Sequence, residues 1–423
     1  MRILLISSSV PWPTHTGGSQ RTNLLHRALS EHGQIDTVVM IRYGIVSEEQ
    51  RVAATERFGG KLFFHNCLPE HRLPWRMAGR YAARLAHAVG GWGLDYMPDP
   101  VVAPRVAELI EQNDYDLIVG RYLWPLARSG AVGLRPTLVD VDDFESDVLE
   151  AELMSRKRPP LKQWWHGRRY RQVLRREQAL LNDCSYIWVA KHADLSRIDR
   201  DDVSVLPNIP FVKPGTSSPQ PCEPRPESQV IMMVGTLEHT VNVRAIDAFI
   251  EYVWPKILAE MPGAVFQIVG SGMSDEMRKQ WGAQPGVEPV GYAEDLREAY
   301  EQCACTVVPI NEGGGTKIKV LESLLMGRTC VVSPHSLRGY EGTLQDGESL
   351  CVGEGDQGMA DGCISLLRDP GLRARLAASG GEVVRKGFTY SQFARTVSEA
   401  VARLTGADGQ VDSSGKPAAT ARA

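Results

Sequence analysis

Short apolar runs alternate with longer amphipathic stretches along this chain, and this alternation limits the possible folds more than any other feature of the sequence. The apolar runs are rich in Val, Ile and Leu with little polar alternation, which is typical of parallel strands covered on both faces. Strands that alternate with helices predict an α/β fold with a doubly wound sheet. In the first half, we expect strands at Ile3–Ser7, Ile35–Ile41, Lys61–His65, Leu117–Gly120, Thr137–Val141, Tyr186–Val189 and Ser204–Leu206, and helices at Gln20–Glu31, Val101–Gln112 and Trp164–Asn182.

A proline-rich segment, Pro207–Gln229, interrupts the alternation and indicates an interdomain linker. The pattern then begins again with the apolar run Val230–Val234, which ends at Gly235. A chain of 423 residues is also long for a single core and favours two domains of about 200 residues each. We therefore expect a Rossmann-like first domain at 1–206, a linker at 207–228, a second Rossmann-like domain at 229–388, a final helix at 389–404 and a disordered tail at 405–423.

Composition argues against several classes of protein. The formal net charge of -4 provides no positive field that would point to nucleic acid, so we expect no nucleic-acid partner. The eight cysteines show no metal-ligand spacing and are expected to be free thiols in a reducing cytosol. No apolar run approaches the roughly 18 residues of a membrane span, and the N-terminal run is too short for a signal peptide. These features predict a cytoplasmic protein.

Three consecutive glycines in the second half form the strongest candidate for a binding site. Gly313–Gly315 would make a loop without side chains, and Thr316 is placed to cap a helix whose first turn carries Lys317 and Lys319. Free backbone N–H groups, the positive end of the helix dipole and two lysines together favour a diphosphate. Because lysines oppose the dipole at this end of a helix, anion binding explains them better than stability does.

Glu322 lies on the same expected helix, in a mostly apolar run. Its carboxylate can accept two hydrogen bonds from ribose hydroxyls; the alternative is a solvated helix glutamate. Gly235 and the segment Gly270–Gly272 also end strands of the second half, where a nucleotide base or phosphate can bind.

Two glycines follow the first strand of the chain and come before a helix. Gly17 and Gly18 would let backbone N–H groups approach an anion at a helix start, although a tight turn explains them equally well. His15, just before them, is a candidate contact to an acceptor. The dinucleotide fingerprint GxGxxG is absent from this loop, which argues against a dehydrogenase.

Three aspartates, Asp140, Asp142 and Asp143, cluster at the end of an expected strand. They can orient acceptor hydroxyls or bind a cation, or they can serve capping and turn formation. The pair Arg121-Tyr122 ends another strand and is a further candidate for acceptor or phosphate contact.

Basic side chains alternate with tryptophans and apolar residues from Arg156 to Arg176, and no acidic residue interrupts this span. A basic amphipathic helix of this kind can rest on an anionic membrane. The alternative is a solvated helix whose arginines pair with acids elsewhere.

With these motifs, the chain resembles the GT-B-fold glycosyltransferases of family 4, the glycosyl transferases group 1. The resemblance rests on Gly17-Gly18, Val234-Gly235, Val269-Gly270 and above all Gly313–Glu322, and it covers nearly all of the chain to about Leu404. The run Gly313–Glu322 is similar to a branch found in bacterial exopolysaccharide and cell-envelope gene clusters. The resemblance implies two Rossmann-like domains that face a cleft, a retaining transfer without a metal, and a final helix that crosses back to the first domain.

Two departures from the family pattern concern the site. Glu322 matches the second glutamate of the family's Glu-x7-Glu motif, but the first position is Gly314, and Glu312 is the nearest acid. The family often carries Arg and Lys after the first strand of its second domain, where this chain offers only Arg244. Lys317 and Lys319 are the candidates to supply that charge.

These expectations predict a glycosyltransferase that moves a sugar from a nucleotide-diphosphate donor to a glycan or lipid-linked acceptor, without metal or cofactor. The alternatives are a catalytically inactive nucleotide-sugar-binding scaffold and a GT-B-fold sugar-nucleotide epimerase. The expected donor contacts are Gly17, Gly18, Gly235, Gly313, Gly314, Gly315, Thr316, Lys317 and Glu322, and the catalytic candidates are Asp142, His15 and Glu312. Arg156–Arg176 predicts peripheral contact with the inner face of a membrane.

Overall fold

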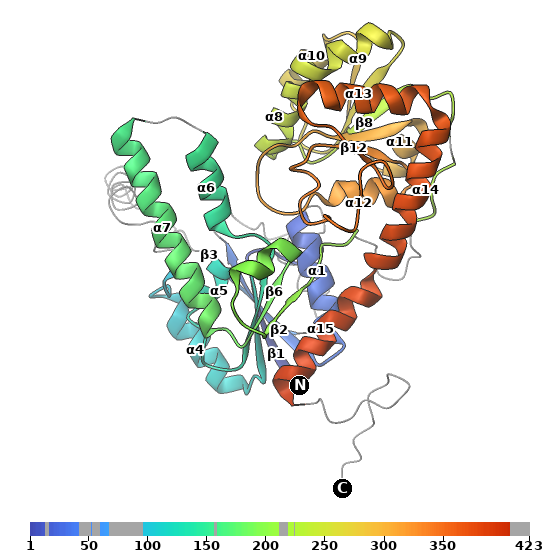
Figure 1. Ribbon diagram of the computed structural model, residues 1–423. Helices are drawn as coiled ribbons and strands as arrows, with labels where there is room; N and C mark the ends of the chain where they lie inside the picture. The colour runs from blue at the N-terminus through green and yellow to red at the C-terminus, as the bar shows by residue number, and fades with distance from the viewer. Residues whose placement is uncertain are drawn as a thin grey trace. The chain divides into compact units, whose positions relative to one another are not determined.

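The computed structural model describes residues 1–12, 17–41, 52, 60–66, 96–155, 159–210, 219–223 and 225–406. The chain divides into two compact units (Figure 1): Met1–Leu206 joined by the chain from Ser391 onwards, and Pro207–Tyr390. Each unit is built on one parallel sheet, which confirms the expected α/β fold with two Rossmann-like units. Of the tail expected at 405–423, only Thr405 and Gly406 are among the described residues.

Seven parallel strands form the sheet of the first unit, in the order β3-β2-β1-β4-β5-β6-β7. β1 and β4 are neighbours although they are far apart in the sequence, with Ile3 aligned with Leu117 and Ile6 with Gly120. The strand order reverses between these two strands, which makes their carboxyl ends the switch point of the sheet. The strands are β1 (Arg2–Ser7), β2 (Gln34–Ile41), β3 (Leu62–Asn66), β4 (Leu117–Arg121), β5 (Thr137–Val141), β6 (Tyr186–Val189) and β7 (Val203–Val205).

Helices cover both faces of this sheet, with α1 and α15 on one side and α4, α5 and α7 on the other in Figure 1. Strand residues such as Leu4, Ile118 and Val139 form a core with the helix residues Val106 and Val173. The strands are buried on both faces, as their apolar composition predicts. The helices are α1 (Gly17–Ser30), α4 (Val102–Asn113), α5 (Leu123–Ser129), α6 (Glu145–Ser155), α7 (Pro160–Asp183) and α15 (Tyr390–Thr405), with the 3-10 helix η2 (His192–Arg197).

Side chains attach the last helix, α15, to the first unit. Ser398 Oγ lies 2.8 Å from His32 Nε2, and Arg403 Nη2 lies 2.6 Å from Asp202 Oδ1. Phe393 is buried with its ring centroid 5.8 Å from the guanidinium carbon of Arg21.

Six parallel strands form the sheet of the second unit, in the order β10-β9-β8-β11-β12-β13. The order again reverses in the middle, where Ile231 of β8 aligns with Cys305 of β11. The second switch point therefore lies between the carboxyl ends of β8 and β11. The strands are β8 (Val230–Val234), β9 (Val265–Val269), β10 (Val287–Gly291), β11 (Cys305–Val308), β12 (Cys330–Val332) and β13 (Cys351–Val352).

The helices of the second unit differ from expectation where a proline intervenes. The sequence predicts one helix over Asn242–Glu260, but the structure has α8 (Thr240–Ala248), the π-helix η3 (Phe249–Val253) and α9 (Trp254–Glu260). Pro255 lacks an N–H group and its ring would clash with the carbonyl four residues earlier, and the wider π turn accommodates it. The other helices are α10 (Asp275–Gly282), α11 (Leu296–Gln302), α12 (Ile318–Leu325), α13 (Gly355–Arg368) and α14 (Pro370–Gly387).

Both edge strands of the second sheet are absent from the sequence-based expectations. β10 contains Pro289 and two exposed positions. An edge strand tolerates proline, but this mixed pattern does not form the apolar run by which the other strands are recognised in the sequence. β13 has only two residues. Among the described residues, no helix combines the length and the apolar character that a membrane crossing requires.

Candidate functional site

The switch point of the second unit brings a strand end, a glycine loop and a helix start together. Gly235 directly follows β8, and the loop after β11 leads into α12. A Cβ on Gly235 would lie 2.7 Å from Lys319 Nζ and 3.0 Å from Asn242 Nδ2. Glycine at this position therefore lets these two side chains reach the end of β8. Open α/β sheets bind their ligands at such a point.

The glycine loop is held in a defined shape. Gly313 has φ +88° and Gly315 has φ +69°, left-handed values that favour glycine. His335 Nε2 lies 2.9 Å from the carbonyl oxygen of Gly313, and since a carbonyl can only accept, Nε2 carries the proton. Burial lowers the pKa of His335, and the charge of Lys317 acts in the same direction. A neutral histidine thus fixes the loop.

Thr316 does not cap the following helix, contrary to the sequence-based expectation. α12 begins at Ile318, and its N-cap residue is Lys317, which makes no side-chain capping bond. Asn208 Nδ2 instead donates to Thr316 Oγ1 at 2.9 Å, so the hydroxyl is turned toward the segment that follows β7. The N-cap side chain leaves the first N–H groups of α12 uncapped, as an anion site at a helix start requires.

The two lysines at this helix start have different roles. Lys317 is buried, and its Nζ donates to the carbonyl oxygens of Gly314 at 2.7 Å and Gly315 at 3.3 Å. Lys319 Nζ donates to Asn242 Oδ1 at 2.9 Å, and Asn242 Nδ2 donates to the carbonyl of Thr236 at 2.8 Å. Lys317 therefore serves the loop, whereas Lys319 reaches across to the end of β8.

Glu322 lies one turn beyond Lys319 on α12, and the two charges influence each other. Burial raises the pKa of Glu322, while the charge of Lys319 opposes this shift. Burial lowers the pKa of Lys319 to about 8, with Glu322 opposing the shift and Lys317 adding to it. The site thus offers a carboxylate that can accept hydroxyl hydrogen bonds and a cation that can bind a phosphate, on one helix.

Glu312 forms an ion pair with Arg244 of α8, whose Nε lies 3.1 Å from Glu312 Oε1. Both side chains are close to half exposed, so water screens the pair and its contribution to stability is small. The acid and the arginine that the sequence offered as substitutes for family residues therefore contact each other.

The glycines of the first unit lie at the start of α1, which begins at Gly17. The carbonyl oxygen of Gly18 accepts from Thr22 Oγ1 at 2.8 Å and from Ser9 Oγ at 3.4 Å. A Cβ on Gly17 would meet no atom within 4 Å, so the space beside this residue is open. His15 lies outside the described residues.

Asp140 within β5 and Asp142 directly after it form an ion-pair network with two arginines. Arg21 donates to both carboxylate oxygens of Asp140, from Nε at 3.0 Å and from Nη2 at 2.6 Å. Arg121 lies between Asp140 and Asp142, with Nε 3.3 Å from Asp140 and Nη2 2.8 Å from Asp142. Arg21, Arg121 and Asp140 are buried. Neither a cation site nor simple turn formation describes Asp140, because its charge is matched by guanidinium groups.

Tyr122 lies at the switch point of the first unit and has an unusual backbone conformation. It follows β4 with φ +71° and ψ +151°, and the guanidinium carbon of Arg121 lies 3.8 Å from its ring centroid. Such a conformation costs a non-glycine residue about 1–3 kcal/mol and is concentrated at functional sites. A cavity of about 550 Å³ adjoins it at the carboxyl ends of β1, β2, β4 and β5. Its lining includes Tyr96, Trp124, Phe144, Asp143 and Glu145.

The sequence of the second unit is similar to that of known proteins. The family "Glycosyl transferases group 1" matches residues 228–369, which contain β8, the glycine loop and α12. The second unit, which contains this match, is called the group 1 domain. A phosphatidyl-myo-inositol mannosyltransferase of Mycobacterium tuberculosis is 28% identical to this chain over 170 residues, 37% of this chain and 43% of the relative. The match thus spans less than half the length of the curated relatives.

Solved structures extend the likeness of the group 1 domain to nearly the whole chain. Sucrose-phosphate synthase from Thermosynechococcus elongatus has a TM-score of 0.66 at 15% identity and covers 96% of this chain and 99% of its own. The Anabaena protein HepE in complex with UDP and glucose has a TM-score of 0.61 at 15% identity, with coverage of 95% and 100%. At these identities the likeness shows the fold, and the chain has the GT-B fold of glycosyltransferases.

Two side chains of this site, Asn242 and His335, are not among those that the sequence singles out. Asn242 stands in the expected helix Asn242–Glu260 and His335 follows the apolar run that forms β12, so no local motif singles them out. In the first unit, Arg121 stood out at a strand end, whereas Arg21 lies within a helix and shows no such signal. Within the described ranges, no group of three or more His, Cys, Asp or Glu side chains is placed to hold a metal ion.

Proposed function

We propose that this protein is a retaining, metal-independent glycosyltransferase that moves a sugar from a nucleotide-diphosphate donor to a glycan or lipid-linked acceptor. We place this reaction in exopolysaccharide or cell-envelope synthesis. The proposal rests chiefly on one observation: Lys319 meets the end of β8 at the switch point of the group 1 domain. The mannosyltransferase relatives support transfer to a cell-envelope lipid.

The donor diphosphate binds, in this proposal, at the uncapped start of α12 and at Lys319. Backbone N–H groups after Gly315 and the helix dipole attract the phosphates, and the ammonium of Lys319 adds a full charge. Glu322 accepts the ribose hydroxyls. The nucleotide tested first is UDP, because HepE, of the same fold, is in complex with UDP.

The reaction breaks the bond between the anomeric carbon and the diphosphate oxygen. Negative charge then grows on that oxygen, and donors already fixed in place stabilise it without reorganisation. Lys319 takes the role that a metal ion has in other transferases. The acceptor hydroxyl attacks the anomeric carbon from the face that the diphosphate leaves and passes its proton to the departing diphosphate oxygen, which retains the configuration and needs no nucleophile from the protein.

We assign the acceptor to the cavity beside Tyr122. Aromatic rings can lie against the apolar faces of a sugar, and the carboxylates of Asp143 and Glu145 can accept its hydroxyl hydrogen bonds. Asp142, held by Arg121, is the neighbouring candidate for orienting the attacking hydroxyl.

We further propose that α7 contacts the inner face of an anionic membrane. Leu161 and Trp164 are 69% and 52% exposed, and Arg168 stacks over the Trp164 ring at 5.9 Å. Arg169 instead pairs with Glu145 at 3.5 Å, so part of the basic span is used within the unit. Arg156, at the start of that span, lies outside the described residues.

The experiment that tests the donor site is a thermal-shift screen with UDP, GDP, ADP, dTDP and CMP sugars in the absence of metal. A ligand present at about 100 times its dissociation constant adds about 2.7 kcal/mol of stability. We expect one nucleotide class to raise the Tm of the wild type and to have much less effect on Glu322→Ala. The matched control is Glu298→Ala on α11, an exposed glutamate outside the site, which should respond like the wild type.

Donor turnover then separates an enzyme from an inactive scaffold, the alternative that Gly314 at the place of the first family glutamate favours. Release of the nucleoside diphosphate in the presence of acceptor lipid supports the transferase. Binding without release over a long incubation favours the scaffold. If no nucleotide sugar raises the Tm, the donor-site assignment is wrong.

A further inference from the structure

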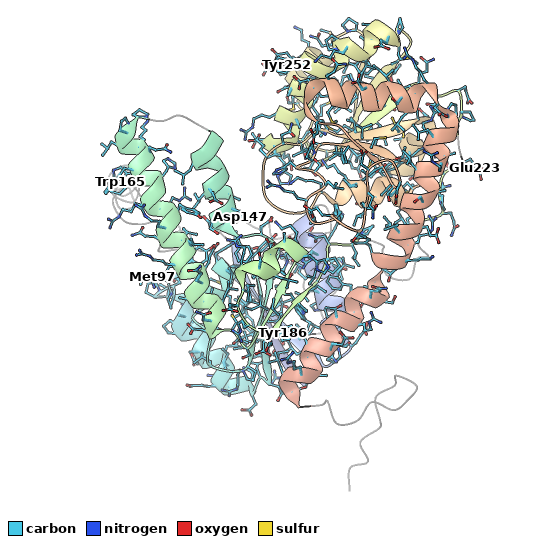
Figure 2. All side chains as sticks on the ribbon, in the orientation of Figure 1. Met97, Asp147, Trp165, Tyr186, Glu223 and Tyr252 are labelled. Carbon is cyan, nitrogen blue, oxygen red and sulfur yellow. The ribbon has the colours of Figure 1, made fainter. Side chains whose placement is uncertain are left out.

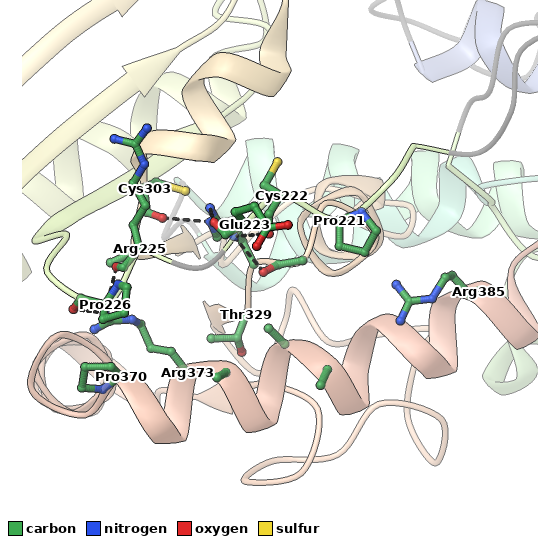
Figure 3. A pocket seen from close by; sticks show the side chains of 16 residues that line it. Pro221, Cys222, Glu223, Arg225, Pro226, Cys303, Thr329, Pro370, Arg373 and Arg385 are labelled. Carbon is green, nitrogen blue, oxygen red and sulfur yellow. Dashed lines mark hydrogen bonds between the residues drawn. The ribbon is translucent and has the colours of Figure 1, made fainter.

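A second cavity, of about 420 Å³, lies in the group 1 domain at the amino ends of the strands, whereas the switch point lies at their carboxyl ends. Ala304 and Thr329 directly precede β11 and β12, so the cavity opens at the amino ends of these strands. Its walls are the residues Pro221, Cys222, Glu223, Arg225 and Pro226 on one side and α14 on the other (Figure 3). The volume falls within the roughly 300–1,000 Å³ of small-molecule sites. The cavity is therefore distinct from the donor site, which lies at the carboxyl ends of the strands.

The charges around this cavity are mainly positive. Arg225, Arg328, Arg373 and Arg385 line it together with a single acid, Glu223. Arg328 and Arg373 are only 4% and 6% exposed, and their hydrogen bonds go to backbone carbonyls. None of the four arginines forms an ion pair with a described residue. Buried charges without a counter-ion are costly, and a cleft lined by one sign of charge attracts the opposite sign.

The charge of one buried guanidinium group also acts on the other. Burial lowers the pKa of Arg373 from its usual value, and the charge of Arg328 acts in the same direction, while Asp369 and Glu227 oppose the shift without forming an ion pair with Arg373. An anion in the cavity would lower this electrostatic cost. The side chains of Arg225 and Arg385 are exposed and supply donors that can turn toward such an anion.

Thr329 provides an independent sign of a ligand. Its side chain is 1% exposed and lines the cavity, yet its Oγ1 has no hydrogen-bond partner among the described residues. Buried polar groups are nearly always paired, so an unpaired hydroxyl at a cavity wall indicates a missing partner. Figure 3 shows Arg225 and Arg373 at one end of the cavity, Arg385 at the other, and Thr329 between them.

The remaining wall is apolar. Ala374, Ala377 and Ala378 lie on one face of α14 and leave room where longer side chains would fill the cavity. The cavity therefore presents a cationic group at each end, a hydroxyl near the middle and an apolar floor.

We propose that this cavity is a second ligand site, for a small organic molecule that carries an anionic group at each end. The arginines at the two ends bind these groups, and the Thr329 hydroxyl bonds to the middle of the molecule. Phosphates and carboxylates both fit the guanidinium fork. The proposal does not depend on the identity of the donor sugar.

The test measures binding of fructose 1,6-bisphosphate and of citrate by calorimetry and by thermal shift, as the phosphate and carboxylate probes. The measurements use Lys319→Met as the background, so that the donor site does not contribute. We expect at least one probe to bind this background as it binds the wild type. Arg225→Gln and Arg385→Gln should each weaken binding about tenfold, the loss of one charge-assisted hydrogen bond. The control Arg368→Gln, an exposed arginine paired with Glu260 outside the cavity, should leave binding unchanged.

Thr329→Val keeps the shape of the side chain and provides a second readout. It removes an unpaired buried hydroxyl, so the ligand-free protein should melt no lower than the wild type, whereas probe binding should weaken. Three results would overturn the proposal: no binding of either probe, equal binding by the control and the cavity variants, or binding that disappears with Lys319→Met alone. Tighter binding of one probe identifies the anion as phosphate or carboxylate.

Discussion

The two lysines of the donor site have different roles: one holds the glycine loop, and the other is placed to bind the ligand. Lys317 and Lys319 are two residues apart, yet the ammonium of Lys317 binds loop carbonyls and that of Lys319 lies at the end of β8. The reduced pKa of Lys319, about 8, makes its role measurable, because a bound diphosphate favours the charged form.

Binding of UDP should take up a proton near pH 8 and weaken as the pH rises. In the ligand-free protein Lys319 is charged below its pKa of about 8 and neutral above it. At high pH, binding of the diphosphate must therefore be coupled to protonation of Lys319, which weakens the binding. Calorimetry at pH about 8 in two buffers of different ionisation enthalpy measures the uptake. Lys319→Met should abolish it and Lys317→Met should retain it; equal uptake by both variants contradicts the assignment. Neutral His335 does not interfere, because burial lowers its pKa.

Because the backbone of Tyr122 is strained, we expect Tyr122→Gly to be more stable than Tyr122→Ala, the reverse of the usual order. Both Tyr122→Gly and Tyr122→Ala lose the ring over Arg121, but only glycine adopts φ +71° and ψ +151° without strain. At ordinary positions alanine is the more stabilising by about 0.4–1 kcal/mol. Here the glycine variant should be the more stable by about 1–3 kcal/mol, measured by denaturant unfolding.

Arg171, within α7, is the matched control position. There the alanine variant should be more stable than the glycine variant by about 1 kcal/mol, as in any helix interior. The same order at both positions would mean that Tyr122 is not strained.

At the scale of elements, Asp140 joins parts of the first unit that are far apart in the sequence. Through Arg21 and Arg121 it connects β5 to α1 and β4, and Arg21 Nη2 also donates to the carbonyl of Leu206, after β7, at 2.8 Å. Glycine and helix patterns give no sign of this connection. Asp140 is one of the three aspartates that the sequence offered as site residues, and its carboxylate is used in this connection.

Asp140→Asn should destabilise the first unit by about 3–5 kcal/mol, because it leaves buried guanidinium charges without their partner. Thermal or denaturant unfolding measures the loss. Asp202→Asn is the control, because Asp202 pairs with Arg403 at the surface with both side chains well exposed, and it should cost at most about 1 kcal/mol. Similar losses for the two variants would show that the buried network adds nothing.

At the scale of the whole molecule, the exposed face of α7 predicts where the protein meets a membrane. Trp164 and Trp165 pack edge to face near the start of this helix, and Trp165 is labelled in Figure 2. The exposed cations on the helix are Lys162, Arg168, Arg171, Arg175 and Arg176.

The protein should sediment with anionic vesicles and not with neutral ones, and added salt should weaken the binding. Arg168→Gln and Arg171→Gln should each reduce binding roughly fivefold, since each basic residue near the surface contributes about 1 kcal/mol. Arg395→Gln on α15, an exposed arginine of the same unit, should have no effect. Absence of sedimentation would leave α7 as a solvated helix.

The sequence alone determined the elements of the fold and the residue types of the donor loop. Apolar runs without alternation encode strands buried on both faces, and three glycines before a helix encode a loop that adopts left-handed φ values, as Gly313 and Gly315 do. These properties are local, so a sequence pattern carries them. The weakly apolar edge strand β10 was missed because its pattern is mixed.

Tertiary structure alone decided which side chains meet. The sheet order sets β8 beside β11 and β1 beside β4, and this adjacency brings Asn242 to Lys319 and Arg21 to Asp140. Whether Thr316 caps α12 depends on Asn208, which lies in a distant segment of the chain. A local pattern fixes backbone conformation and burial, whereas the partner of a buried charge depends on where the chain crosses over and returns, and only the folded molecule contains that information.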